Sequence, residues 1–174
     1  MNLLRNRAES LPLSARQFVK FCIVGGMNTA LDWTLTYLLF YHSGFPQLVV
    51  QQVAHLLGSV NPSDAALFVS KCIATSVAVC NSFFWNRRWT FRVTGRDGRR
   101  RQFIRFAAVN LTGLALNSII ATTVVAVLRG ALGFEGDPPK LVFMYGLATA
   151  TGIVLFWNFL ANRYWTFRVK DNGG

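Results

Sequence analysis

A segment of eight residues that occurs twice constrains this chain more than any other feature. Asn86 to Val93 reads N-R-R-W-T-F-R-V, and Asn162 to Val169 reads N-R-Y-W-T-F-R-V. Each copy follows an apolar run, 65–85 in the first case and 141–161 in the second. Roughly 20 apolar residues can cross a bilayer as a helix, and Trp, Tyr, Lys and Arg collect where such a helix reaches the interface. Each copy is therefore expected to mark the point at which a spanning helix leaves the membrane.

The charge of the chain is distributed as in a membrane protein. Of its 174 residues, 52% are hydrophobic, yet 18 Lys and Arg against 7 Asp and Glu give a net charge of +11. On a soluble protein, such a charge would favour nucleic acid as a partner. Here the basic residues lie in short blocks that are separated by apolar runs too long for ordinary core helices. Nucleic-acid binding is therefore not expected.

Four apolar runs are long enough to span a membrane, and they predict the fold class. The segment 42–64 after the first run is shorter and more polar, and its apolar residues fall at helical spacing. It is expected to form a short amphipathic helix on the outer face, with Ser63 or Asp64 capping the next span. We predict an all-α integral membrane protein, a single domain over residues 1–174 with four transmembrane helices. These helices are expected at about 18–41, 65–86, 103–128 and 141–161.

The positions of Lys and Arg predict the orientation of these spans. The N-terminal segment carries four of them, the middle loop 87–105 carries eight and the C-terminal segment carries three, which is 15 of the 18. Because cytoplasmic loops are enriched in Lys and Arg, both termini and the middle loop are expected in the cytoplasm. The expected location is the cytoplasmic (inner) membrane. The N-terminus has no apolar core of a signal peptide, so the first span is expected to stay in the mature chain.

The chain is predicted to be an internal duplication of one helical hairpin. R-Q-F-V-K-F at 16–21 matches R-Q-F-I-R-F at 101–106. Repeat one then covers about 16–93 and repeat two about 101–169, with the insert 42–64 in the first repeat only. A hairpin returns the chain to the side from which it starts. The halves are therefore expected to be parallel repeats, about an axis along the membrane normal.

The two motifs together resemble the GtrA-like family. R-Q-F-x-[KR]-F opens one span and N-R-x-W-T-F closes the next, twice, so that the resemblance covers 16–169. It implies a small four-helix membrane protein that flips a polyprenyl-phosphate-linked monosaccharide to the outer leaflet for cell-surface glycan synthesis. The alternative is an accessory protein that recruits or anchors a polyprenyl-phosphate glycosyltransferase and transports nothing. The insert and Ser82, which stands where the second copy has Asn158, depart from the family pattern.

Neither an enzyme nor a cofactor or metal site is expected from the residues themselves. The sequence has no nucleotide-binding loop and no cluster of His, Cys and carboxylates. Cys22, Cys72 and Cys80 lie inside apolar runs without disulfide or metal spacing, and we expect them to be small buried hydrophobic residues. Four short helices enclose little volume, so a homo-oligomer, most simply a dimer in membrane lipid, is expected.

The ends of the spans supply candidate substrate contacts. The guanidinium group of Arg offers phosphate a planar fork of donors, and Trp can stack on a sugar or an isoprenoid. The same Arg and Trp can instead be topology anchors, and Asn in a span can simply join two helices. The residues expected to bind phosphate are Arg87, Arg88, Arg163 and Lys71. Those expected to contact sugar or lipid are Asn28, Asp32, Asn86, Trp89, Asn158, Asn162 and Trp165.

Two ionisable residues are expected inside the first two spans at similar depths. Asp32 lies about nine residues and Lys71 about six residues from the outer end of its span, which is ~13 and ~9 Å at 1.5 Å per residue. Because unpaired charges in a bilayer are costly, the two side chains are predicted to form an ion pair in the outer half of the membrane. The pair either holds the hairpin together or lets Lys71 receive a lipid phosphate. With Asp32 paired, a drug exporter that needs a lone acid is disfavoured.

Overall fold

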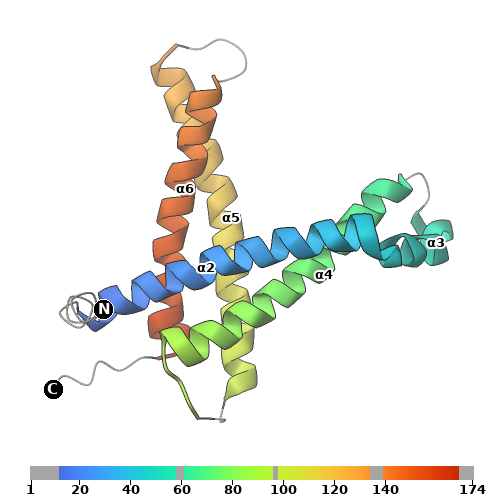
Figure 1. Ribbon diagram of the computed structural model, residues 1–174. Helices are drawn as coiled ribbons and strands as arrows, with labels where there is room; N and C mark the ends of the chain where they lie inside the picture. The colour runs from blue at the N-terminus through green and yellow to red at the C-terminus, as the bar shows by residue number, and fades with distance from the viewer. Residues whose placement is uncertain (1–11, 58–60, 96–97, 134–138, 169–174) are drawn as a thin grey trace, which may run out of the picture. The chain divides into compact units, whose positions relative to one another are not determined.

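A computed structural model describes residues 12–57, 61–95, 98–133 and 139–168 of the chain (Figure 1). All regular structure in these residues is helical. The chain divides into two compact units, Met1–Arg92 and Val93–Gly174. Each unit contains two long helices that pack against each other, α2 with α4 in the first and α5 with α6 in the second.

The first unit has three α-helices and two π-helical turns in its described residues. Helix α2 continues directly into the turn η1, and Gly44, in the left-handed conformation with φ of 63°, ends it. The next helix, α3, falls within the segment expected to form a short amphipathic helix. The elements are α2 (Leu13–Leu38), η1 (Leu39–Ser43), α3 (Phe45–Leu57), α4 (Pro62–Trp85) and η2 (Asn86–Thr90).

The start of α4 differs from the prediction. Asn61, not Ser63 or Asp64, is the N-cap, and its side-chain Oδ1 accepts a hydrogen bond from the Ser63 N–H at 2.9 Å. Pro62 takes the first helical position, where its missing N–H costs nothing and its fixed φ suits the helix. The residue before a proline avoids the helical region, which leaves Asn61 extended and able to cap.

The second unit consists of α5 (Arg99–Ala131), α6 (Lys140–Ala161) and the π-helical turn η3 (Asn162–Thr166). The basic middle loop is shorter than predicted. Helix α5 begins at Arg99, directly after Gly98, so Arg100, Arg101 and Arg105 lie on a helix rather than in a loop. Arg is among the better helix formers, so that a basic segment next to an apolar run extends the helix instead of interrupting it.

Three helices are long and apolar enough to cross a membrane. They are Pro62–Thr90, Arg99–Ala131 and Lys140–Thr166, each including its π-helical turn where it has one. Helix α2 has 26 residues, ~39 Å at 1.5 Å per residue, but polar residues such as Asn28 and Asp32 lower its apolar character. The described part of the chain therefore confirms three of the four predicted spans by length and composition.

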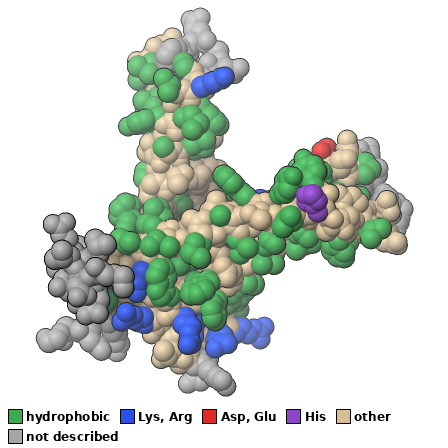
Figure 2. All heavy atoms as spheres, in the orientation of Figure 1, with side chains coloured by type: hydrophobic (Ala, Val, Ile, Leu, Met, Phe, Trp, Pro, Cys, Tyr) green, Lys and Arg blue, Asp and Glu red, His purple; other side chains and the backbone are tan. Residues whose placement is uncertain are grey.

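Large apolar side chains cover the outside of both units, as Figure 2 shows. Phe68, Leu111 and Leu141 expose 70%, 68% and 84% of their surface. Hydrocarbon solvates such side chains, whereas in water they would form an apolar patch far larger than those of soluble monomers. Cys72 and Cys80 belong to this outer surface, so the expectation that they are buried was wrong.

Helices α5 and α6 pack tightly at Gly146. A Cβ atom at this position would lie 2.5 Å from Val125 Cγ2 and 3.1 Å from the Ala121 carbonyl oxygen. Neither neighbour yields easily, since one is backbone and the other is a stiff β-branched side chain. Small residues of this kind let membrane helices pack backbone to backbone.

We expect Gly146→Ala to destabilise the second unit by about 1–3 kcal/mol, the usual effect of overpacking. Gly152→Ala is the matched control, because an added Cβ on the same helix meets nothing within 4 Å. The control should be as stable as the parent chain or slightly more stable, since Ala favours helix over Gly. Thermal unfolding of both variants in detergent measures the difference, and equal stability would contradict the close approach.

Candidate functional site

In the first unit, the motif that opens α2 packs against the motif that closes α4. The Lys20 ammonium lies 5.1 Å from the centre of the Trp89 ring, and its Nζ donates to the Trp89 carbonyl oxygen at 3.5 Å. The same contact also has an apolar part, in which the centres of the Phe21 and Phe91 rings lie 6.4 Å apart. The two motifs of the first unit thus pack directly against each other.

The second unit repeats this contact with its own copies of the motifs. The Arg105 guanidinium lies 5.5 Å from the centre of the Trp165 ring, and Nη1 donates to the Trp165 carbonyl oxygen at 3.1 Å. The rings of Phe106 and Phe167 are 6.2 Å apart. A cation therefore covers one face of both tryptophans that were predicted to contact sugar or lipid.

Each copy of the N-R-x-W-T-F motif forms a π-helical turn at the end of the preceding helix, η2 after α4 and η3 after α6. The Phe91 N–H donates to the Asn86 carbonyl oxygen at 2.8 Å, and the Phe167 N–H donates to that of Asn162 at 2.9 Å. The residue that follows each Phe is an arginine in the left-handed region, with φ of 54° and 45°. π-Helical segments are rare and often lie at functional sites.

The polar side chains of this motif are almost completely enclosed. Arg87 exposes 7% of its surface and Arg163 only 2%, whereas Arg88 is exposed. The other members of the two buried sets are Asn86 and Thr90 in the first copy and Asn162 and Thr166 in the second. Of the arginines predicted to bind phosphate, Arg88 is thus the one that presents its donors at the surface.

The first unit also contains the predicted ion pair. Lys71 Nζ on α4 pairs with Asp32 Oδ2 on α2, and Thr75 Oγ1 donates to Asp32 Oδ1 at 2.8 Å. Both carboxylate oxygens of Asp32 are therefore engaged, and its side chain is 15% exposed. Lys71 is 49% exposed and has further N–H donors. The pair leaves a cation accessible at the surface of the hairpin.

A second polar contact continues this line along α2 and α4. Asn28, one turn before Asp32, accepts a hydrogen bond from Asn81 Nδ2 at 3.0 Å and donates to the Val24 carbonyl oxygen at 2.7 Å. An amide inside a hydrocarbon layer needs such partners, because leaving it without them costs several kcal/mol. The contact joins the two helices, and it also leaves Asn28 buried rather than open to a substrate.

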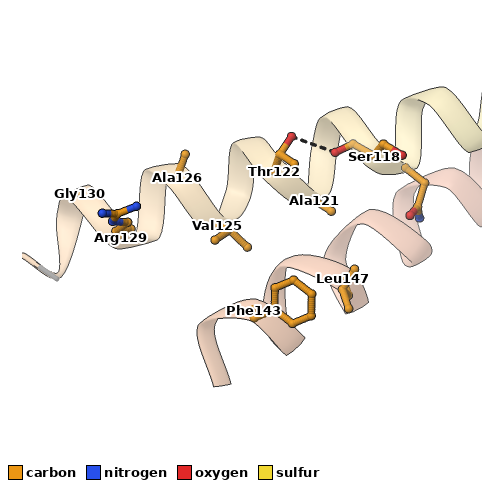
Figure 3. Close-up of a pocket in the computed structure, with 10 residues that line it drawn as sticks. Ser118, Ala121, Thr122, Val125, Ala126, Arg129, Gly130, Phe143 and Leu147 are labelled. Carbon is orange, nitrogen blue, oxygen red and sulfur yellow. Dashed lines mark hydrogen bonds between the residues drawn. The ribbon is translucent and has the colours of Figure 1, made fainter. Parts of the chain in front are cut away.

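The second unit has a groove where the first has the ion pair. Leu147 corresponds to Lys71, since each lies 15 residues before the Asn of its N-R-x-W-T-F motif. Asn117 corresponds to Asp32, since each lies 16 residues after the Arg of its R-Q-F-x-[KR]-F motif. Leu147 and Asn117 line a groove of about 680 Å³ between α5 and α6 (Figure 3). Towards the middle of the hairpin Asn158 packs against Gly113, whose added Cβ would lie 2.6 Å from Asn158 Oδ1. The two hairpins therefore differ at the positions of the ion pair.

A basic groove lies at the start of α5 around Trp165. It has a volume of about 660 Å³ and includes Arg100, Arg101, Arg105 and Ile104 in its lining. Arg101 and Arg105 are four residues apart on α5 and so lie on one face of it. These arginines were expected in a loop and were not among the predicted site residues. Their spacing was the signal that could have found them.

Comparison with known proteins identifies the family to which the chain belongs. Residues 20–167 match the family described as GtrA/DPMS, transmembrane domain. The chain belongs to this family. The resemblance inferred from the two motifs is thus confirmed. The GtrA/DPMS match begins at Lys20, within the motif that opens α2, and includes both N-R-x-W-T-F motifs, the Asp32–Lys71 pair and the groove between α5 and α6.

A bacterial protein is similar to this GtrA/DPMS chain over most of its length. It is the uncharacterised membrane protein YngA of Bacillus subtilis (strain 168), 25% identical over 148 residues. These residues are 85% of this chain and 77% of YngA. YngA is itself uncharacterised, so the similarity names no substrate.

Proposed function

We propose that this GtrA/DPMS protein translocates a polyprenyl-phosphate-linked monosaccharide across the cytoplasmic membrane, for cell-surface glycan synthesis. Its family links it to processes that use polyprenyl-phosphate sugars. The observation that carries the proposal is Lys71, a half-exposed cation on an apolar helix that is held in place by Asp32. Such a charge inside a bilayer is costly, and it commonly marks the pathway of a substrate of opposite charge.

Four membrane spans are part of this proposal, with α2 as the fourth. Helix α2 pairs its polar residues with α4 through Asn28 and Asp32, which lowers the cost of placing them in hydrocarbon. Both termini and the loop before α5 then lie in the cytoplasm, with α3 on the outer surface, because the basic residues collect on one side. The protein stays in the inner membrane, where the lipid-linked sugar is made.

Labelling of single cysteines with a membrane-impermeant maleimide on whole cells tests this orientation. In a chain with Cys22, Cys72 and Cys80 replaced by alanine, Ser63→Cys should react with the reagent, since its side chain is exposed at the start of α4. Thr94→Cys, exposed in the loop before α5, should react only after the cells are permeabilised. The opposite pattern would reverse the orientation.

In the first unit, the proposed path begins at the exposed Arg88, which attracts the lipid phosphate at the cytoplasmic surface, and continues past Lys71. The exposed Arg100 and Arg101 of the second unit attract phosphate at the same surface, and the apolar tail stays in the surrounding lipid. Lys71 then compensates the phosphate charge within the bilayer, where hydration is lost. Movement follows the gradient between synthesis inside and consumption outside, so no nucleotide is needed.

Purified protein in vesicles tests the proposal. Vesicles carry a fluorescent polyprenyl-phosphate hexose in both leaflets, and a membrane-impermeant reductant quenches the label in the outer leaflet. Protein-free vesicles should lose about half of the fluorescence, and vesicles with the protein should lose nearly all of it. A fluorescent phosphatidylcholine should stay in its leaflet, which excludes a general leak. Translocation is refuted if the labelled sugar lipid also stays there.

An accessory role is the second candidate, and the basic start of α5 favours it. Arg99, Arg100 and Arg101 are exposed there and form a surface that an acidic partner could bind. In this role the protein anchors a polyprenyl-phosphate glycosyltransferase at the membrane. Retention of the sugar lipid in its leaflet, together with co-purification of the glycosyltransferase, would select this role over translocation.

A further inference from the structure

A separate pocket lies beside the ion pair, towards the η1 end of α2. It has a volume of about 290 Å³ and is formed by the second half of α2, the turn η1 and one face of α4. Four of its seven lining residues are aromatic, one is charged, Lys71, and the other two are Thr36 and Leu67. The residues that form it include Trp33, Thr36, Tyr37, Phe40, Tyr41 and Lys71.

The aromatic side chains of this pocket are open and arranged along one face of the helix. Trp33, Tyr37 and Tyr41 follow one another at four-residue spacing and expose 69%, 56% and 66% of their surface. The rings of Tyr37 and Tyr41 are 5.0 Å apart. Residues four apart on a helix are neighbours on its surface, so the three rings form a platform on the face that lines the pocket together with Lys71.

Anchoring at the membrane interface does not account for the whole platform. A belt of Trp and Tyr lies at the level of the lipid headgroups. Trp33 stands ten residues before Ser43, the end of η1, which is ~15 Å deeper along the helix at 1.5 Å per residue. It directly follows Asp32, the residue that holds Lys71. The ring therefore stands at the depth of the ion pair rather than at the interface.

The lining matches a sugar that carries a phosphate. The C–H faces of a hexose pack on aromatic rings, and an ammonium group binds phosphate as a compact point charge. Asp32, which also accepts a hydrogen bond from Thr75, fixes the position of Lys71 and uses only part of its three N–H donors. A phospholipid would use the cation but would leave the row of rings without a function.

We propose that this pocket binds the sugar and the phosphate of the lipid-linked monosaccharide together, with Trp33, Tyr37 and Tyr41 against the sugar and Lys71 against the phosphate. The inference rests on the proposed function and names the part of the path at which the sugar is recognised. It places recognition in the first unit alone, because Leu147 stands where the second unit would need the lysine.

Binding to the full chain in lipid nanodiscs tests the pocket. The probes are citronellyl phosphate and its glucose, galactose and mannose phosphodiesters, each titrated by calorimetry. Trp33→Leu should weaken binding of the preferred sugar phosphodiester about 3- to 10-fold, the range expected from loss of one aromatic contact. It should change binding of the sugar-free phosphate less than twofold. Lys71→Met should weaken the binding of both kinds of probe.

Trp157→Leu is the matched control, an exposed Trp on α6 in the other unit, and it should leave all affinities unchanged. Tyr41→Leu replaces Trp33→Leu if the latter does not fold, as judged by circular dichroism. The pocket is rejected if the parent chain binds no sugar probe more tightly than citronellyl phosphate, or if loss of the ring weakens both kinds of probe equally. Sugar-selective binding without movement in vesicles would instead reject translocation and leave the pocket standing.

Discussion

Replacing Lys71 by methionine is expected to abolish translocation and to destabilise the first unit by about 2–4 kcal/mol. Methionine keeps the length of the side chain but leaves the Asp32 carboxylate, 15% exposed, without its cation. Removing the cation costs more than the pair contributes, because an uncompensated and mostly enclosed carboxylate remains. Thermal unfolding in detergent and the fluorescent-lipid assay in vesicles measure the two effects separately.

The double variant Asp32→Asn with Lys71→Met separates a structural role from a functional one. With both charges removed, the penalty of the lone carboxylate disappears, and Thr75 can still donate to the amide oxygen at position 32. Stability should return to within about 1 kcal/mol of the parent chain. Translocation should stay absent, because the lipid phosphate has no cation to meet. If the double variant moves the sugar lipid at the parent rate, the ion pair only holds the hairpin together.

Replacing Arg163 by methionine is expected to destabilise the second unit by about 2–3 kcal/mol. Its side chain is 2% exposed within η3 and lies 5.4 Å from the ring of Tyr164. Enclosed charged groups are held by hydrogen bonds that contribute about 1.5–3 kcal/mol each, which methionine cannot make. Loss of function in this variant should follow the loss of folded protein, as measured by thermal unfolding and by the amount of protein extracted from the membrane.

Arg101→Gln is the contrasting variant, because Arg101 is an exposed residue of the basic groove. Its unfolding temperature should equal that of the parent chain, and its affinity for citronellyl phosphate should fall about fivefold, which corresponds to ~1 kcal/mol. If Arg163→Met is as stable as the parent chain and loses phosphate binding, the buried arginine rather than the groove contacts the phosphate.

Much of the fold follows from the pattern of apolar runs. The helices extend only a few residues beyond the predicted spans, and α3 falls within the predicted amphipathic segment. The Asp32–Lys71 pair followed from depth alone, because two charges at the same level of adjacent helices have few other partners. The cap at Asn61 was missed because the effect of Pro62 on its neighbour outweighs the choice between Ser63 and Asp64.

The burial of the repeated motif could not be predicted from the same rules. An Arg next to a Trp at a helix end is typical of an interface anchor, and that pattern says nothing of the π-helical turn that directs Arg87 and Arg163 inward. The residue that follows each turn packs in a tertiary contact, Phe91 on Phe21 and Phe167 on Phe106, which the local pattern does not show. The aromatic row of α2 and η1 was not selected from the sequence, although its three rings stand at four-residue spacing.

Solid-state NMR measures the proposed contact between Lys71 and the lipid phosphate most directly. Protein with ¹⁵N-labelled lysine in bilayers with citronellyl phosphoryl-hexose allows dephasing of the Lys ammonium signal by ³¹P to be recorded. We predict dephasing of the Lys71 signal, assigned by its loss in Lys71→Met, and its disappearance when citronellyl hexoside without phosphate replaces the probe. A Lys71 signal that phosphorus never dephases, in protein that binds the probe, would contradict the account.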